Sequence, residues 1–166
     1  MAEKIDKIVE RMLQEGLGKP AIWRKLKDRE DHQKALFYLN TSSYPADRKK
    51  VQFHNLVIAA VLTFITFKKL IVAFSFGVLD LFLFLSLIVP IVNVYVLREV
   101  LRFRKIGYQF LFVLSILALV QPENHHWQEA SLLFILISIS GYMYLTLFPK
   151  KAEIKDEEVR QKNDSK

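Results

Sequence analysis

One carboxylate, Asp80, stands in the middle of a long apolar stretch of this 166-residue chain. A charged carboxylate at the centre of a membrane costs at least about 2.5 to 3.5 kcal/mol, so it has to face protein or water. Hydroxyl groups in two later apolar stretches fall at a similar depth when each stretch is counted from its end. The pattern predicts an intramembrane polar layer made of Asp80, Ser115, Ser138 and Ser140.

The role of Asp80 stays open between three alternatives. A buried carboxyl without a cationic neighbour usually stays neutral, and it would then act as a hydrogen-bonded packing contact. A second role is the transfer of protons or cations through the membrane. A third is pairing with a basic residue of a partner subunit, because this chain has no Lys or Arg at that depth.

Between Gln121 and Glu129 the sequence holds two carboxylates and two imidazoles in nine residues, a composition that suggests a metal site. Adjacent histidines rarely converge on one ion, and the sequence lacks the pair of histidines four residues apart that binds zinc on a helix. We therefore expect no metal, and predict an external turn whose side chains contact a partner. The candidates for that contact are Glu123, His125, His126 and Trp127.

Sequence motifs of catalysis are missing from this chain. It has no cysteine, and none of its five glycines belongs to a phosphate-binding loop or a nucleophile elbow. We expect neither an enzyme nor a cofactor, but a protein that acts through protein–protein interaction as an accessory subunit, an anchor, or an inhibitor or immunity-type protein. The alternative is an ion or proton channel or a transporter subunit that uses Asp80. Such a protein would have to be oligomeric, because four short spans are too few to enclose a pore alone.

Four apolar stretches would position these residues, and each is long enough to cross or nearly cross a hydrocarbon core of about 30 Å as a helix. Backbone groups at that depth must bond within the helix. The sequence predicts an all-α, polytopic membrane protein. Its four-helix transmembrane bundle occupies residues 46–149, with spans at about 51–67, 70–88, 106–120 and 130–148. Lys68 and Lys69 would form the first turn, and Pro90 with Asn93 would kink the second helix.

The basic residues sort to one side of this bundle. With both termini inside, 22 of the 24 Lys and Arg are cytoplasmic, and the positive-inside rule selects that orientation. The net charge of +7 then belongs next to anionic lipid. The compact spans favour a bacterial cytoplasmic membrane, with the endoplasmic reticulum as the alternative.

Residues 1–45 are predicted to form a small cytoplasmic helical hairpin, in which one helix ends at Gly16 and the next starts at Pro20. Ile22, Trp23 and Leu26 would form an apolar face that contacts a partner. The sequence does not decide whether residues 27–34 are helical. The charged tail, residues 150–166, has too few apolar residues to bury a core, and we expect it to be disordered or a loose helix.

The stretch from Met12 to Leu26 resembles the first two helices of helix-turn-helix domains. A DNA reader also needs a recognition helix with exposed basic and amide side chains. Instead, Lys27 to Lys34 mixes both charge signs, and Ala35 to Leu39 is apolar. We therefore expect the lipid bilayer and a protein partner or a second copy of the chain as partners, and no nucleic acid.

Overall fold

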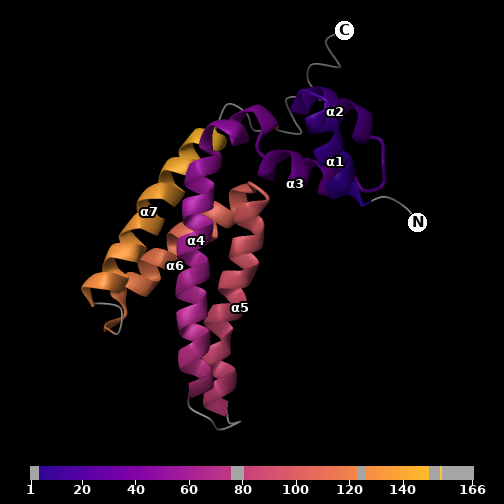
Figure 1. The fold of residues 1–166 in the computed structure, drawn as a ribbon. Coiled ribbons are helices and arrows are strands. Elements are labelled where there is room, and N and C mark those ends of the chain that lie inside the picture. The colour runs from indigo at the N-terminus through magenta and orange to yellow at the C-terminus, as the bar shows by residue number, and fades with distance from the viewer. Residues whose placement is uncertain (1–3, 76–80, 123–125, 150–153, 155–166) are drawn as a thin grey trace. The chain divides into compact units, whose positions relative to one another are not determined.

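The computed structural model describes residues 4–75, 81–122, 126–149 and 154 of the chain. These residues form seven α-helices, so the predicted all-helical architecture is confirmed (Figure 1). The chain divides into two compact units. The first unit is Met1–Lys49 together with Leu147–Lys166, and the second is Lys50–Thr146. The helices are α1 (Ile5–Gln14), α2 (Lys19–Leu26), α3 (His32–Thr41), α4 (Pro45–Ser75), α5 (Leu81–Leu101), α6 (Lys105–Val120) and α7 (Trp127–Leu147).

Helix α1 has one buried face, because apolar residues recur along it three and four positions apart. Val9 and Leu13 of that face lie in the core of the first unit. The helix ends before Gly16, whose φ of 83° is a left-handed conformation that glycine adopts without a Cβ clash. The amide of Leu17 then donates to the carbonyl of Met12, 3.1 Å away, in a Schellman cap.

The first unit contains three helices where the sequence predicted a hairpin of two. Helix α3 begins at His32 and packs against both α1 and α2. Of the polar run that the sequence left undecided, residues 32–34 are helical and residues 27–31 connect α2 to α3. Ala35 and Leu39 are the two fully buried apolar residues of α3. Two apolar positions that directly follow a polar run are too few to show a helical period in the sequence.

Ile22, Trp23 and Leu26 were predicted to contact a partner, and they lie instead in the core of the first unit. None of the three is more than 2% exposed. They belong to the same buried cluster as Ala35 and Leu39 of α3. The predicted role is wrong because the third helix, which the sequence did not reveal, covers this face of α2.

The end of the chain returns to the first unit through Ile154. Its amide donates to Oδ1 of Asn40, 2.9 Å away, and its carbonyl accepts from Nδ2 of the same side chain at 3.0 Å. The Ile154 side chain is 9% exposed and belongs to the hydrophobic core of this unit. The rest of the predicted charged tail lies outside the described residues, but at Ile154 the chain is packed.

Helix α4 begins at Pro45, a residue type favoured at the first position of a helix, and continues without a break to Ser75. Lys68 and Lys69 lie inside this helix, so the predicted turn there is wrong. The next described helix, α5, begins at Leu81, so the spans predicted at 51–67 and 70–88 do not match the bounds of α4 and α5. Lysine is a good helix former, and its long side chain carries the ammonium away from apolar surroundings, so two lysines need not end a helix.

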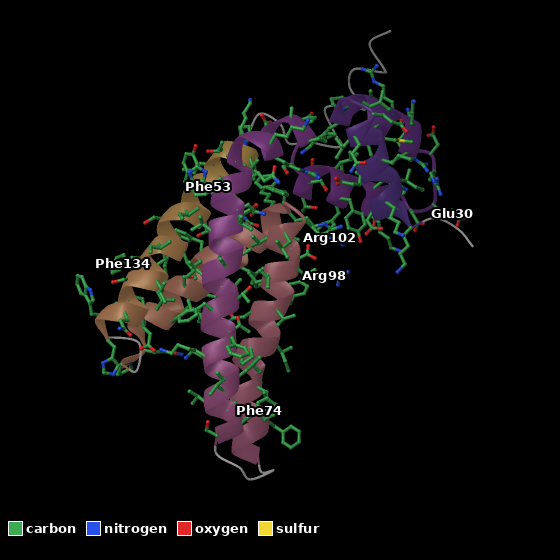
Figure 2. The ribbon with its side chains drawn as sticks, in the orientation of Figure 1. Glu30, Phe53, Phe74, Arg98, Arg102 and Phe134 are labelled. Carbon is green, nitrogen blue, oxygen red and sulfur yellow. The ribbon has the colours of Figure 1, made fainter. Side chains whose placement is uncertain are left out.

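Three of the described helices are long and apolar enough to cross a membrane: α4, the Phe84–Leu101 part of α5, and α7. Helix α6 is also apolar, but its 16 residues measure about 24 Å, less than a typical hydrocarbon core. Phe53 and Phe74 of α4 and Phe134 of α7 lie on the outside of the second unit and are more than half exposed (Figure 2). Such a surface is suited to contact with lipid.

Helix α5 continues through Pro90, whose ring is fully buried. The sequence predicted a kink near Pro90 and Asn93 because a single helix from Leu70 to Leu97 would overshoot the bilayer. Of that run, residues 70–75 belong to α4 and residues 81–97 to α5. Pro90 removes one backbone donor, but it does not end the helix.

A tight turn joins α5 to α6, and it brings the two helices into close contact. Phe103 in this turn has a φ of 53°, a conformation that non-glycine residues seldom adopt. The amide of Arg104 donates to the Glu99 carbonyl at 3.0 Å, and its guanidinium donates to the buried Glu99 carboxylate at 3.2 Å. Gly107 then lies against α5, where a Cβ would come within 2.6 Å of the Val100 nitrogen.

Replacing Gly107 by alanine should therefore force α5 and α6 apart. We expect Gly107→Ala to lower the free energy of unfolding by about 1 to 3 kcal/mol, the usual cost of overpacking. Gly141→Ala is the matched control, since its Cβ would meet only the Phe112 ring at 3.5 Å. Denaturant unfolding of the full chain in detergent compares the two. Equal midpoints for both variants would contradict the close contact.

Candidate functional site

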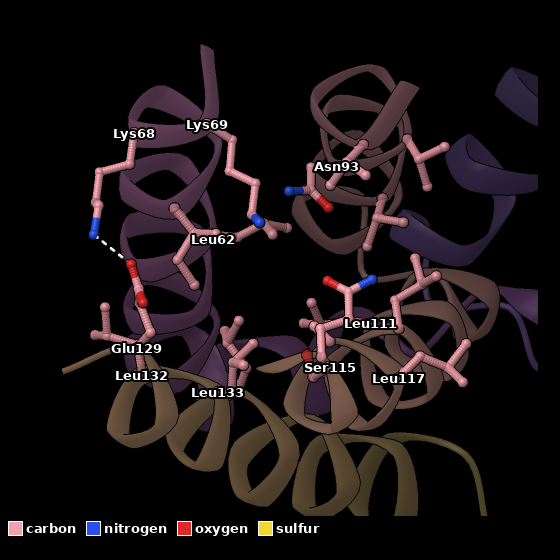
Figure 3. Close-up of a pocket in the computed structure, with 18 of the residues that line it drawn as sticks. Leu62, Lys68, Lys69, Asn93, Leu111, Ser115, Leu117, Glu129, Leu132 and Leu133 are labelled. Atoms are coloured by element: carbon pink, nitrogen blue, oxygen red, sulfur yellow. Dashed lines mark hydrogen bonds and ion pairs between the residues drawn. The ribbon is translucent and has the colours of Figure 1, made fainter. Parts of the chain in front are cut away.

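A cavity of about 330 Å³ lies among the four helices of the second unit (Figure 3). Its wall is mostly apolar, and every one of α4, α5, α6 and α7 contributes side chains to it. The lining includes Leu62 and Ile65 of α4, Ile88 and Val92 of α5, Leu111, Leu114 and Ala118 of α6, and Leu132, Leu133 and Leu136 of α7. Volumes of this size are typical of small-molecule sites.

Charged groups gather at one end of this cavity, where α6 ends and α7 begins. Lys68 of α4 donates to the carboxylate of Glu129 in the first turn of α7, with 2.6 Å between nitrogen and oxygen. Lys69 and Gln121 line the same end. The Lys69 side chain projects toward the cavity, on the side of α5 (Figure 3). The charged rim, Lys68, Lys69 and Glu129, carries a formal charge of +1.

Two polar side chains lie farther along the wall. Asn93 of α5 and Ser115 of α6 both line the cavity, and the figure shows Asn93 directed into it (Figure 3). Ser115 is buried. The sequence had marked Asn93 only as part of a kink and Ser115 only as part of a polar layer. The structure gives both a second property, because each contributes a polar atom to an otherwise apolar wall.

The predicted polar layer stays a prediction. Asp80 lies outside the described residues, and its mid-span depth was inferred from a turn at Lys68 and Lys69 that does not exist. The serines have different surroundings: Ser138 is exposed, whereas the buried Ser140 donates to the carbonyl of Ile137 in its own helix. Of the described part of the chain, Ser115 alone among these hydroxyls faces the cavity.

The external turn can be followed only in part. Glu123 and His125 lie outside the described residues, while His126 and Trp127 are exposed, Trp127 by 85%. Within the described ranges no three His, Cys, Asp or Glu side chains gather closely enough to hold a metal ion. A partner contact through this turn remains a prediction.

A buried polar cluster at the opposite end of the second unit was not foreseen. Asn55 of α4 donates through Nδ2 to the carbonyl of Val100 in α5, at 3.2 Å. The hydroxyl of Tyr108 in α6 donates to Oδ1 of Asn55 at 2.7 Å. Tyr108 is fully buried. The cluster joins α4, α5 and α6 by hydrogen bonds.

Asn55 and Tyr108 should therefore depend on each other for stability. We expect a double-mutant cycle of Asn55→Ala and Tyr108→Phe to give a coupling energy of about 0.6 to 1.7 kcal/mol, the range of interhelical polar contacts in membranes. Tyr142→Phe paired with Asn55→Ala is the control, because Tyr142 is half exposed. Its coupling should be near zero. Additive effects at Asn55 and Tyr108 would contradict the hydrogen bond.

Comparisons with known proteins do not add to this site. The chain matches no protein-family model, no curated protein and no solved structure. Its function therefore has to be argued from its own residues: the lined cavity, the charged rim, and the first unit with its separate core.

Proposed function

We propose that this chain is a four-span integral membrane protein that presents its first unit in the cytoplasm and acts by binding a protein partner there. The observation that carries the proposal is the pairing of Asn40 with Ile154, which makes both ends of the described chain part of one folded unit. A folded unit cannot lie on both sides of a bilayer. The spans between residues 45 and 147 therefore cross an even number of times.

Four crossings fit this requirement better than two. Helices α4, α5 and α7 are each long enough to span, and an even count then needs α6 as the fourth. Its length of about 24 Å is a small mismatch, which local thinning of the bilayer accommodates at a fraction of a kcal/mol per Å. The positive-inside rule places the shared end of the chain in the cytoplasm, in a bacterial cytoplasmic membrane or the endoplasmic reticulum.

The first unit is built as a folded body of its own. Arg48, in the first turn of α4, pairs with the carboxylate of Glu10 in α1, and its Nη2 also donates to the carbonyl of Ser43 at 2.8 Å. Bidentate pairs of this kind fix geometry as well as adding stability. A soluble unit fastened in this way is suited to holding a fixed surface toward a partner.

Phe37 is the residue through which we propose that the partner binds. Among the described residues of the first unit it is the one large apolar side chain on the surface, 50% exposed. Its ring meets that of Tyr38 edge-on, with centroids 5.6 Å apart. Aromatic residues are enriched in interface hot spots because they bury much area with little loss of entropy. In this proposal Phe37 is the partner contact instead of Ile22, Trp23 and Leu26 of α2, because those three residues are buried.

The topology is open to a direct test, since the chain has no cysteine of its own. Single cysteines replace Lys27, Gln128 and Lys155 in otherwise unchanged chains. We expect a membrane-impermeant maleimide to label intact cells at Gln128→Cys only, and the other two variants after lysis. Labelling at position 155 but not at 27 in intact cells would mean an odd number of crossings, and would contradict the proposal.

Partner binding is tested with Phe37→Ser and its control Gln33→Ala, an exposed position one turn earlier on the same face of α3. Each tagged chain is cross-linked in its native membrane and purified in mild detergent, and the mass of the purified complex is measured. Wild type and Gln33→Ala should hold a stoichiometric partner, and Phe37→Ser should hold at least about tenfold less, as expected for loss of a hot spot of about 2 kcal/mol. A bare 19.4 kDa monomer, or a conducting homo-oligomer, would contradict the proposal.

A further inference from the structure

We infer that the cavity of the second unit is a binding site for one anionic phospholipid, with its phosphate at Lys69 and an acyl chain along the apolar wall. The inference rests on the proposed placement of α4 to α7 in the bilayer, but not on the proposed protein partner. The cavity has a charged rim at one end and a hydrocarbon wall along the rest (Figure 3). A phospholipid has the same division along its length.

The position of the rim matches the depth of lipid headgroups. Counted from Val51, where the apolar part of α4 begins, Lys69 lies about 27 Å along the helix, close to the far edge of a hydrocarbon core of about 30 Å. Gln121 follows the last residue of α6, and Glu129 lies in the first turn of α7. The rim therefore lies at the external interface, and the apolar wall extends from there toward the middle of the bilayer.

The charges of the rim select the sign of the ligand. The ammonium of Lys68 is occupied by the Glu129 carboxylate. Lys69 is half-buried, and no ion pair or hydrogen bond of its ammonium is found among the described residues. The two lysines and one carboxylate of the rim leave a net charge of +1 at the mouth of an apolar cavity, and this charge favours a headgroup with a net negative charge. A phosphate also offers the oxygen acceptors that an ammonium requires.

An acyl chain matches the wall of the cavity, which is apolar over most of its length. Asn93 and Ser115 add two polar atoms along the path of that acyl chain.

The selectivity for one lipid over another should come from the charge of the headgroup rather than from the acyl chain. Lipid tails are as apolar as leucine, so moving a tail from the bilayer into the cavity gains little and distinguishes no headgroup. A lysine near the membrane surface favours an anionic lipid by about fivefold. The expected preference is therefore modest, and it depends on one residue.

The test measures lipid retention by the purified full chain. Phosphatidylglycerol and phosphatidylcholine with identical acyl chains are supplied in equal amounts, and bound lipid is counted by native mass spectrometry. Wild type should retain phosphatidylglycerol about fivefold over phosphatidylcholine. Lys69→Gln should abolish the preference, and Lys69→Glu should reverse it. Lys49→Glu, the same change at the opposite end of α4, should leave the preference at its wild-type value.

Equal retention of both lipids by wild type would overturn the inference. So would a preference that persists in Lys69→Glu, or one that Lys49→Glu removes equally, since either result would mean a general charge effect. If Phe37→Ser loses its protein partner but still binds phosphatidylglycerol selectively, the lipid site does not depend on the proposed partner. That result would support the inference whatever the outcome for the partner.

A second measurement keeps the inference testable if a charge variant does not fold. Phosphatidylglycerol with a photoreactive group in its acyl chain should label the cavity-lining side chains of wild type: Leu111, Leu114 and Ala118 of α6, and Leu132, Leu133 and Leu136 of α7. Ala118→Phe fills the cavity without changing its charge, and should reduce that labelling at least about fivefold. Labelling confined to the outward-facing phenylalanines, or unchanged by Ala118→Phe, would overturn the inference.

Discussion

The carbonyl oxygen of Val100 is the point at which three helices of the second unit meet. A carbonyl in the last turn of a helix has no hydrogen-bond donor within that helix. Inside a bilayer, little water is available to act as the donor instead. Here it accepts from the amide of Phe103 at 2.9 Å, from Asn55 at 3.2 Å and from the Tyr108 hydroxyl at 3.4 Å. Gly107 makes this possible, because any side chain there would collide with α5. The turn, the position of α4 and the register of α6 all depend on this one acceptor.

Much of the fold could be predicted from the sequence because it follows from local rules. The apolar runs had to be helices in a membrane, Pro45 is a favoured first residue of a helix, and Gly16 is a favoured stop. The predicted turn at Lys68 and Lys69 was wrong because two charges in an apolar run look like a helix boundary. Lysine is also a good helix former, and its long side chain can carry the ammonium away from apolar surroundings while the helix continues. The depth of Asp80 was inferred from that boundary, so one misplaced turn affected the reading of a whole site.

The cavity could not have been predicted by the same reasoning. Most of its lining residues are apolar members of helices in which nearly every residue is apolar, so no position stands out. Lys69 and Glu129 are sixty residues apart, and only the arrangement of four helices brings them to one rim. Asn55 is likewise a single amide beside a histidine at the end of a span, with no spacing to link it to Tyr108. Sites assembled from isolated residues of several helices leave no pattern in the sequence.

The pairing of Asn40 with Ile154 also has a consequence for the order of events during translation. Most domains near the start of a chain fold as soon as they leave the ribosome, at about 5 to 20 residues per second. The first unit cannot finish in that way, because one of its core side chains lies 114 residues after Asn40. Its surface is completed on the order of ten seconds later, after α7 has been made. Any molecule that recognises the finished surface therefore meets only chains whose synthesis has passed α4 to α7.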